Sequence, residues 1–447
     1  MAKIIDSVFH RDFNTNYPII THGEGSHVFT EDGEAYIDGS SGAVAANLGH
    51  SNENIAKAMY EQAMKIGFVH TMRFETNLLH LTSQKIIELA PKNMESVFFC
   101  SGGSEANESA IKLCRQMNRD RGKATKFISI GRWQSYHGNT IGSLSVGGDV
   151  QRRYPYTPLL NKTEHIDAPY YPPHFSEGDK IQEDERCLNQ LRRVINEVGS
   201  ESISAIIVEP IVGSQQGAMV PTSIYLKGIR NICSEFDIYM IVDEVMTGFY
   251  RTGESFAILH EKDVVPDIIT FGKGVTAGYA PLAGMIVHEN LMKQLKKYSN
   301  GKFLHGFTYS GHPVCLAAGY SAIAEYENQN IKENVKNQSS FIYKRLNEIK
   351  KNSKTIGSIR GKGLLIGIEF FENKEEVKYF DKEKLFAAKF NSLAMKKGAV
   401  FYPGSGGLDG TKGEHILIAP PLNITTADVE KLMTIFEETL YEMERTI

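Results

Sequence analysis

Six short apolar runs recur through the middle of the chain, and each is followed by a polar or glycine-bearing turn and then a helix-like stretch. The runs are rich in β-branched and aromatic residues and lack clean alternation, which is typical of strands covered on both faces. They lie at residues 96–100, 126–130, 205–208, 239–242, 267–271 and 283–287. This order predicts an α/β fold with a mostly parallel central sheet and helices on both faces.

Apolar residues recur at intervals of three and four in three stretches, which predicts amphipathic helices. The stretches are residues 104–119, 316–350 and 426–446, the last with Thr425 or Thr426 as its N-cap. Short alternating pieces lie toward the two chain ends, at residues 27–30, 35–38 and 364–370. We therefore expect a large domain over residues 66–327 and a smaller α+β domain assembled from residues 1–65 and 328–447.

Composition narrows the class of protein. The chain has 447 residues, of which 41% are hydrophobic and 23% charged, so it can bury a large core and is neither disordered nor fibrous. A formal net charge of -4 provides no basic surface for a polyanion, and nucleic acid binding is disfavoured. The five cysteines are scattered without a C-x-x-C pair, so neither a disulfide framework nor a zinc ribbon is expected.

Targeting signals are not evident in the sequence. Residues 1–11 lack the apolar core of a secretion signal, and no run approaches the ~18 apolar residues of a membrane span. We expect a soluble cytoplasmic protein with no membrane partner.

Two carboxylates come where buried strands should end. Asp243 follows one apolar run and Glu209 another, at the edge where α/β proteins hold their ligands. A carboxylate in such a place needs a cationic or N–H partner, because desolvation without one is costly. A Mg²⁺ site is the alternative, but no further acidic cluster accompanies the pair, and we expect no metal.

Lys273 follows a third buried run and lies between Gly272 and Gly274. A dehydrated lysine has a depressed pKa and can form a Schiff base, although a solvated loop lysine is the common alternative. With Gly278, these glycines imitate a dinucleotide fingerprint, but Pro281 interrupts the helix that should follow. No Walker pattern is present.

A glycine-bearing turn and an aromatic residue complete the chemical set. Residues 101–107 (SGGSEAN) follow a strand and open a helix, so Gly103 and Ser104 form either a phosphate cradle or a capped turn. Tyr136 and His137 precede Gly138 after another strand. Tyr136 can stack on a flat ring, and a core role is the alternative for both side chains.

An amine, a strand-end acid, a phosphate cradle and a stacking aromatic are the parts that a pyridoxal-phosphate enzyme requires. Residues 242–253 (VDEVMTGFYRTG), followed by residues 271–274 (FGKG), are similar to the class III (omega) aminotransferases of fold-type I. The spacing of 30 residues between Asp243 and Lys273 is the one that this family shows. The resemblance extends from about Phe29 to Thr425.

The resemblance implies pyridoxal 5'-phosphate as cofactor and two catalytic residues. Lys273 would carry the cofactor as an internal aldimine and then act as general base, and Asp243 would keep the pyridine nitrogen protonated. The cofactor-binding residues implied are Gly103 and Ser104 at the phosphate, Tyr136 and Val245 against the ring faces, His137 beside Tyr136, Glu209 near the phenolic oxygen, and Phe307 and Thr308 at the phosphate of a partner subunit.

The activity implied is transfer of an amino group from an amine or omega-amino acid to a 2-oxo acid such as pyruvate, in a homodimer with shared active sites. An epimerase, an aminomutase or a decarboxylating transaminase of the same fold is the alternative, and a non-catalytic relative is another. Some members use an arginine near residues 406–415 for the substrate carboxylate, and others use one directly before the Ala-Pro-Pro step. This chain has no arginine in residues 406–415, and Ile418 directly precedes Ala419. Arg73, Arg132 and Lys412 are the replacements considered, with Arg132 favoured.

Overall fold

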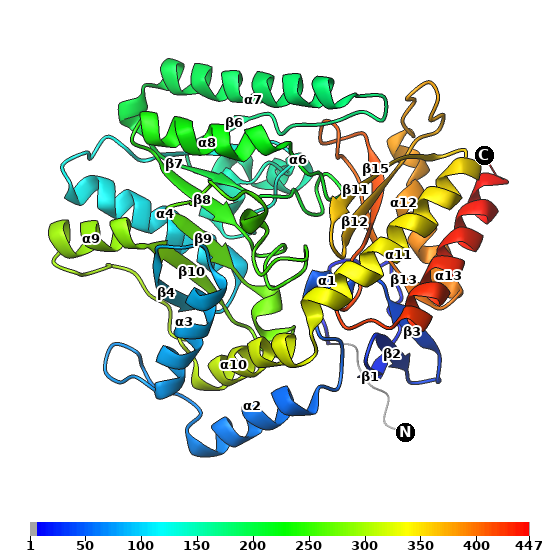
Figure 1. Cartoon of the computed structure of the whole chain (residues 1–447), viewed down its shortest axis with the longest axis horizontal. Coiled ribbons are helices and arrows are strands. Elements are labelled where there is room, and N and C mark those ends of the chain that lie inside the picture. The colour runs from blue at the N-terminus through cyan, green and yellow to red at the C-terminus, as the bar shows by residue number, and fades with distance from the viewer. Residues whose placement is uncertain (1–6, 447) are drawn as a thin grey trace.

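The computed structural model of the chain describes residues 7–446, which form a large α/β part and a smaller part beside it (Figure 1). A seven-stranded sheet with the order β4-β10-β9-β8-β7-β5-β6 runs through the large part. Strands β6, β5, β7, β8 and β9 pair in parallel, whereas β10 is antiparallel to both β9 and β4. The predicted α/β fold with a mostly parallel sheet is confirmed.

Each of the six predicted runs overlaps a strand of this sheet. The strands are β4 (Met94–Cys100), β5 (Ile128–Arg132), β6 (Thr163–Ile166), β7 (Ile203–Val208), β8 (Tyr239–Asp243), β9 (Ile268–Phe271) and β10 (Ala283–His288). Strand β6 was not predicted, because its sequence, TEHI, is short and mostly polar and the strand pairs along one edge only, with β5.

Alternate residues of the central strands point into two separate apolar clusters. In β7, Ala205 and Ile207 pack on one face with α4 (Gly103–Asp120) and α9 (Glu289–Tyr298). Ile206 and Val208 pack on the other face with α3 (Asn77–Leu89), α7 (Glu177–Val198) and α8 (Ser223–Glu235). Burial on both faces explains why the sequence of β7 is apolar throughout.

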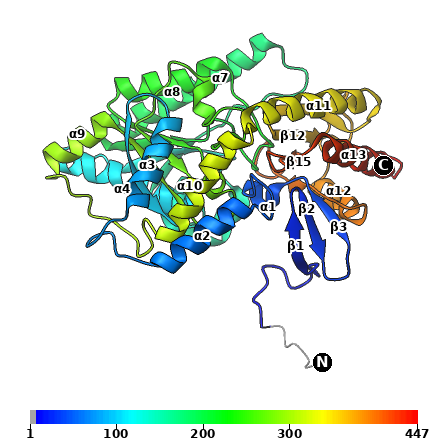
Figure 2. The same cartoon turned by 60° about the horizontal axis from the view of Figure 1, so that its bottom comes forward.

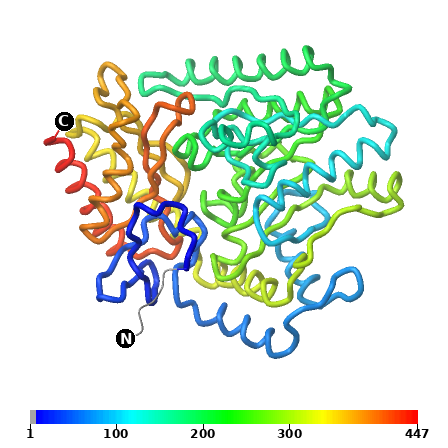
Figure 3. The backbone as a smooth tube through the Cα atoms, turned by 180° about the vertical axis from the view of Figure 1, so that it is seen from behind, coloured from blue at the N-terminus to red at the C-terminus, as the bar shows by residue number. Residues whose placement is uncertain are grey.

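The small part combines both ends of the described chain, which lie side by side in Figure 3. One sheet has the order β1-β2-β3-β13 and the other β11-β12-β15-β14. These strands are β1 (Ile20–Glu24), β2 (His27–Thr30), β3 (Ala35–Asp38), β11 (Ile356–Lys362), β12 (Leu365–Phe370), β13 (Ala399–Val400), β14 (Tyr402–Gly404) and β15 (Glu414–Ile418). Helices α11 (Ile331–Asn352), α12 (Phe386–Lys396) and α13 (Thr426–Glu444) pack with them (Figure 2).

The domain boundaries at residues 65 and 328 remain a proposal. Parallel pairing of Ile37 in β3 with Ala399 in β13 supports a small domain built from both chain ends. Helix α2 (Glu53–Lys65) instead packs against α10 (Pro313–Asn328) of the large part. The N-terminal segment therefore contacts both parts.

The helical pattern expected over residues 316–350 is present, but it is divided by a break that the pattern did not predict. The structure has two helices there, α10 and α11, separated at Gln329 and Asn330. Asn330 adopts a left-handed conformation with φ of 49°, which no continuous helix allows and which asparagine tolerates better than most residues. Apolar periodicity continues through the break because both helices bury a face, so the pattern concealed the turn.

Shorter segments complete the described chain. They are helices α1 (Ser41–Val44), α5 (Ile141–Val146) and α6 (Val150–Arg153), and 3₁₀ segments at Tyr154–Leu159, Ser200–Ser202, Ala257–His260, Lys273–Thr276 and Lys382–Lys384. None of the helices among residues 7–446 combines the length and apolar character needed to cross a lipid bilayer.

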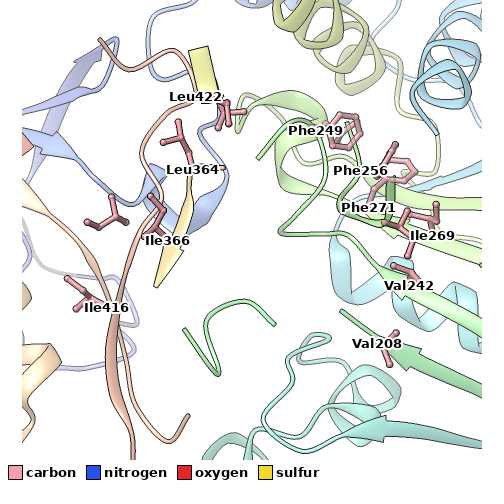
Figure 4. Packing of buried hydrophobic residues seen from close by; sticks show 14 of the residues in the cluster. Val208, Val242, Phe249, Phe256, Ile269, Phe271, Leu364, Ile366, Ile416 and Leu422 are labelled. Carbon is pink, nitrogen blue, oxygen red and sulfur yellow. The ribbon is translucent and has the colours of Figure 1, made fainter. Parts of the chain in front are cut away.

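One apolar cluster joins the two parts of the molecule (Figure 4). Val208, Val242 and Phe271 belong to the large sheet, and Ile366 and Ile416 belong to the small part. Because both parts share this packed core, the ends of β7, β8 and β9 are held at a fixed position beside the small part. The candidate site lies at these strand ends.

Candidate active site

A cavity of about 170 Å³, called here the inner pocket, opens at the carboxyl ends of β7, β8 and β9 and the start of α4. Eight of the predicted site residues line it together: Gly103, Ser104, Tyr136, His137, Glu209, Asp243, Val245 and Lys273. The parallel strands explain this convergence, because their carboxyl ends meet at one edge of the sheet.

Asp243 is the last residue of β8 and is held by three hydrogen bonds. Its Oδ2 accepts from Asn107 Nδ2 at 2.8 Å and lies 2.8 Å from His137 Nδ1, and its Oδ1 accepts from the Val245 backbone N–H at 3.0 Å. Hydrogen bonds from several donors fix the orientation of a buried carboxylate. Asp243 therefore presents an oriented carboxylate on the wall of the pocket.

Lys273 begins the turn that follows β9 and its side chain lines the same pocket. Its φ of 45° is in the left-handed region, where a residue other than glycine is held only by its surroundings. Burial lowers the pKa of the Lys273 amine from 10.5 to about 8, while the nearby Asp243 carboxylate opposes that change. Roughly a tenth of the amine is therefore neutral and nucleophilic at pH 7, and the neutral fraction grows as the pH rises through 8.

The N-terminus of α4 lines the inner pocket with Gly103 and Ser104, and no side chain of residues 7–446 caps this helix. A Cβ on Gly103 would lie 2.7 Å from Val245 Cγ1, so only glycine lets the helix approach Val245 this closely. Ser104 Oγ accepts a hydrogen bond from the Asn139 N–H at 3.1 Å. Gly138 has φ of +128°, and a side chain there would collide with Ser104. These residues form a concave, N–H-rich surface suited to a phosphate group.

Glu209 follows β7 and has one carboxylate oxygen unused. Its Oε1 accepts from the Gly213 N–H at 3.3 Å, whereas its buried Oε2 has no hydrogen-bond partner within residues 7–446. Burial raises the pKa of Glu209, and the neighbouring His137 and Arg132 act in the opposite direction. This oxygen lacks a hydrogen bond, although Arg132 Nη2 lies 3.7 Å away, and it can therefore accept one from a bound polar group.

Arg132 was the favoured candidate for the substrate carboxylate, and this expectation is wrong. Only 1% of Arg132 is exposed, and its Nη2 donates to the Glu209 backbone carbonyl at 2.8 Å and lies 3.7 Å from Glu209 Oε2. Arg132 ends β5 behind Glu209 and does not line the inner pocket. The other two candidates, Arg73 and Lys412, are exposed and also lie outside that lining.

Phe307 and Thr308 do not line the inner pocket of this chain. Phe307 packs beside Cys100, Ala106 and Ala283, and Thr308 is exposed. Their expected contact is with the phosphate of a second subunit, so this placement leaves that prediction open.

Sequence reasoning missed several lining residues, namely Asn107, Ile211, Ser214, Met246 and Thr247. Asn107 is the most informative, because it donates to both Asp243 Oδ2 and the His137 carbonyl and accepts from Thr270 at 2.7 Å. A signal existed: Asn107 lies one helical turn after Ser104, on the same face of α4. A buried asparagine on that face requires polar partners.

Comparison with known proteins places this geometry in a family. The model of the aminotransferase class-III family matches residues 9–440. The chain is 34% identical over 438 residues to the uncharacterized aminotransferase YodT of Bacillus subtilis, covering 98% of each chain. It is 32% identical to a putrescine–pyruvate aminotransferase of Pseudomonas aeruginosa, covering 94% of this chain and 90% of the relative.

Solved structures agree with the sequence relatives. The structure of a transaminase from a marine Virgibacillus superposes with a TM-score of 0.91 at 32% identity, covering 96% of this chain and 94% of the other. The chain belongs to the class III aminotransferases, enzymes that depend on pyridoxal phosphate. The resemblance inferred from residues 242–253 and 271–274 is thereby confirmed.

Proposed function

We propose that this protein transfers an amino group from an amine or omega-amino acid to a 2-oxo acid such as pyruvate, using pyridoxal phosphate bound at Lys273. The observation that carries the proposal is the presence of Lys273 and Asp243 in one pocket of about 170 Å³ with the N-terminus of α4. Family membership and the pyruvate-dependent relative support the same reaction.

The residues of the inner pocket fit the cofactor. The unpaired Oε2 of Glu209 and the glycine-lined start of α4 are features that a bound phosphorylated ring would use. Gly103 and Ser104 would hold the phosphate, Tyr136 and Val245 would contact the ring faces, and Asp243 would bind the ring nitrogen. When bound, the cofactor supplies an electron sink for the carbon that carries the amino group.

Asp243 and Lys273 would stabilise charge and transfer protons around the bound cofactor. Asp243, fixed by Asn107 and His137, would keep a protonated ring nitrogen favourable because its negative charge lies in a buried site. Lys273, with a pKa of about 8, would hold the cofactor and, once released, remove and return the proton at the substrate carbon. A neutral amine is required for the first of these roles.

A visible absorption spectrum tests the proposal directly. We expect the purified protein to absorb in the visible region, borohydride to abolish that band, and peptide mass mapping to find the reduced cofactor on Lys273. Amines of a donor panel should then bleach the untreated protein and yield the matching aldehyde or keto acid. Racemisation of an amino acid without keto-acid formation would instead favour an epimerase, and a colourless protein that cannot be reconstituted would favour a non-catalytic role.

We further propose that a second copy of this chain completes the site. Several large apolar side chains are exposed on neighbouring segments, among them Met72 at 78%, Phe74 at 67% and Leu304 at 71%. Phe68 and Tyr309 lie edge to face at 5.9 Å, so the segment before α3 adjoins the segment that carries Phe307 and Thr308. Contiguous exposed apolar surface of this kind marks an interface. If the protein is a dimer, light scattering should give twice the 49.9 kDa mass of one chain.

A further inference from the structure

A second cavity, of about 370 Å³ and called here the outer pocket, adjoins the inner pocket. Ser214 lines both, and the outer pocket is otherwise built from residues 134, 148–152, 215, 402–406 and 410. Its lining is mostly polar and contains one arginine, Arg152, and one carboxylate, Asp149. Neither residue has a role in the cofactor site described above.

Asp149 contacts both the backbone and the side chain of Arg152. The Oδ1 of Asp149 accepts from the Arg152 backbone N–H at 3.0 Å and thereby caps α6. Its Oδ2 lies 2.8 Å from Arg152 Nε in an ion pair. The Asp149 side chain is 12% exposed and the Arg152 side chain 44%. The carboxylate is therefore occupied by Arg152, while much of the guanidinium remains accessible.

The Tyr136 ring supports the same guanidinium. The central carbon of the Arg152 guanidinium lies 5.1 Å from the centroid of the ring, within the range of a cation–π contact. Tyr136 lines the inner pocket, so its side chain connects the cofactor site with Arg152. Within residues 7–446, no hydrogen bond is made by Nη1 or Nη2 of Arg152. The guanidinium is thus anchored at Nε and at its face, with its two terminal nitrogens free.

A guanidinium in this state is a receptor for a carboxylate. Two parallel N–H groups match the two oxygens of a carboxylate, and a side chain already held in one orientation loses little freedom on binding. Arg73, Arg132 and Lys412 do not line either pocket. Among the residues that line the two pockets, Arg152 is the one arginine, and it lines the outer pocket.

We propose that Arg152 binds the carboxylate of the amino donor, and that the preferred donor is an omega-amino acid whose amine reaches Lys273 in the inner pocket. This inference rests on the proposed transaminase function. The two ends of the donor would lie in different cavities, on either side of the Tyr136 side chain. An α-amino acid, whose amine and carboxylate share one carbon, would not span them.

Donors that differ only in the charge of their far end test the proposal. We would compare 5-aminopentanoate with 5-aminopentanamide, measuring kcat/KM for the wild type and for Arg152→Gln. The substitution should lower kcat/KM for the carboxylate donor by ~10- to 100-fold, the range of a charge-assisted hydrogen bond, and change it for the amide by less than about 3-fold. Arg193→Gln, on the exposed surface of α7, is the matched control and should alter neither.

A binding measurement provides a readout that does not depend on turnover. Calorimetric titration of the holoenzyme with pentanoate should give a dissociation constant at least ~10-fold weaker for Arg152→Gln than for the wild type. Asp149→Asn keeps a residue that caps α6 but removes the charge that anchors Nε, and it should weaken binding by a smaller factor. Arg152→Lys keeps the charge but loses the paired N–H groups, and its dissociation constant for pentanoate should lie between those of the wild type and Arg152→Gln.

The outcomes separate the two proposals. Equal pentanoate affinity in the wild type and all three variants overturns the role of Arg152, as does an equal loss of kcat/KM for the carboxylate and amide donors. If no donor yields a carbonyl product while Arg152→Gln still weakens pentanoate binding, the carboxylate site stands and the transaminase proposal fails. If Arg152→Gln does not fold, Arg152→Lys carries the same test.

Discussion

The inner and outer pockets adjoin each other but are assembled in different ways. Asp243, Glu209 and Lys273 each follow a buried strand, and Gly103 begins the helix after another, so the sheet itself brings the inner pocket together. The outer pocket takes its lining from loops, from the short helix α6 and from the three-residue strand β14, in both parts of the molecule. The central sheet thus fixes the groups proposed for the chemistry, whereas the groups proposed to bind the far end of the donor lie on segments outside that sheet.

The largest effect should come from the amine of the inner pocket. Lys273→Ala removes both the attachment point and the proposed base, and we expect kcat to fall by roughly 10⁴-fold with every donor. Stopped-flow absorbance and steady-state assays on the reconstituted variant measure this loss. Lys293→Ala, an exposed lysine on α9, should behave like the wild type. A Lys273→Ala enzyme that keeps more than about 1% of its activity would contradict the proposed mechanism.

Removing the charge of Asp243 should have the next largest effect. Asp243→Asn keeps the shape of the side chain but not its negative charge, and we expect kcat to fall about 10²- to 10³-fold for carboxylate and amide donors alike. Glu244→Gln is the matched control. Glu244 is equally buried, bonds Thr247 and the Ala257 and Ile258 N–H groups, and does not line the inner pocket.

The control is informative because it disturbs hydrogen bonds at the end of β8 without changing the charge of Asp243. Both oxygens of Glu244 accept from N–H groups, and glutamine keeps only one acceptor oxygen. Activity of Glu244→Gln within about 3-fold of the wild type is expected. A loss as large as that of Asp243→Asn would show that general damage at the end of β8, and not the charge of Asp243, explains both results.

Arg132→Gln sharpens the contrast between the two pockets. Arg132 donates to the Glu209 carbonyl behind the inner pocket, so its loss should disturb Glu209 and lower kcat/KM by about 10-fold, equally for 5-aminopentanoate and 5-aminopentanamide. Arg152→Gln should instead discriminate between these donors. A selective loss for the carboxylate donor in Arg132→Gln would return the carboxylate role to Arg132.

The smallest effect concerns stability of the protein without cofactor. Below pH 8 the Lys273 amine is charged in both the folded and the unfolded protein, and burying the charge destabilises the folded state. Between pH 8 and 10.5 the amine is neutral in the folded protein but still charged in the unfolded one. The free energy of unfolding therefore rises with pH in this range. Lys273→Met lacks this penalty. We expect it to raise the free energy of unfolding by on the order of 1 kcal/mol at pH 7 and by less at pH 9.5, as urea denaturation would measure. A difference that grows with pH would contradict the lowered pKa.

The sequence predicted the inner pocket better than the outer one for a physical reason. Asp243 ends one buried apolar run and Lys273 closely follows another, so each polar residue is conspicuous in the apolar pattern. Arg152 lies in a polar stretch, where an arginine does not stand out from its neighbours, and Arg132 was favoured because it lies near Tyr136 in the sequence. Only the backbone course reveals that Arg132 is enclosed and that Arg152 reaches Tyr136.

The same limit applies to the fold. Periodicity predicted helices on either side of Asn330 but not the break, because both α10 and α11 bury an apolar face across it. Strand β6 escaped notice because an edge strand needs no apolar run.

The sequence alone determined the α/β class, the strand-end acid and lysine and the glycine-bearing turn, because these depend on local patterns of burial and backbone freedom. The tertiary structure decided which polar residues share a cavity, which arginine is buried behind Glu209 and which remains accessible beside Tyr136. The outer pocket joins segments as far apart as residues 134 and 410, and the distances between such segments are set by packing of the two parts around a common core.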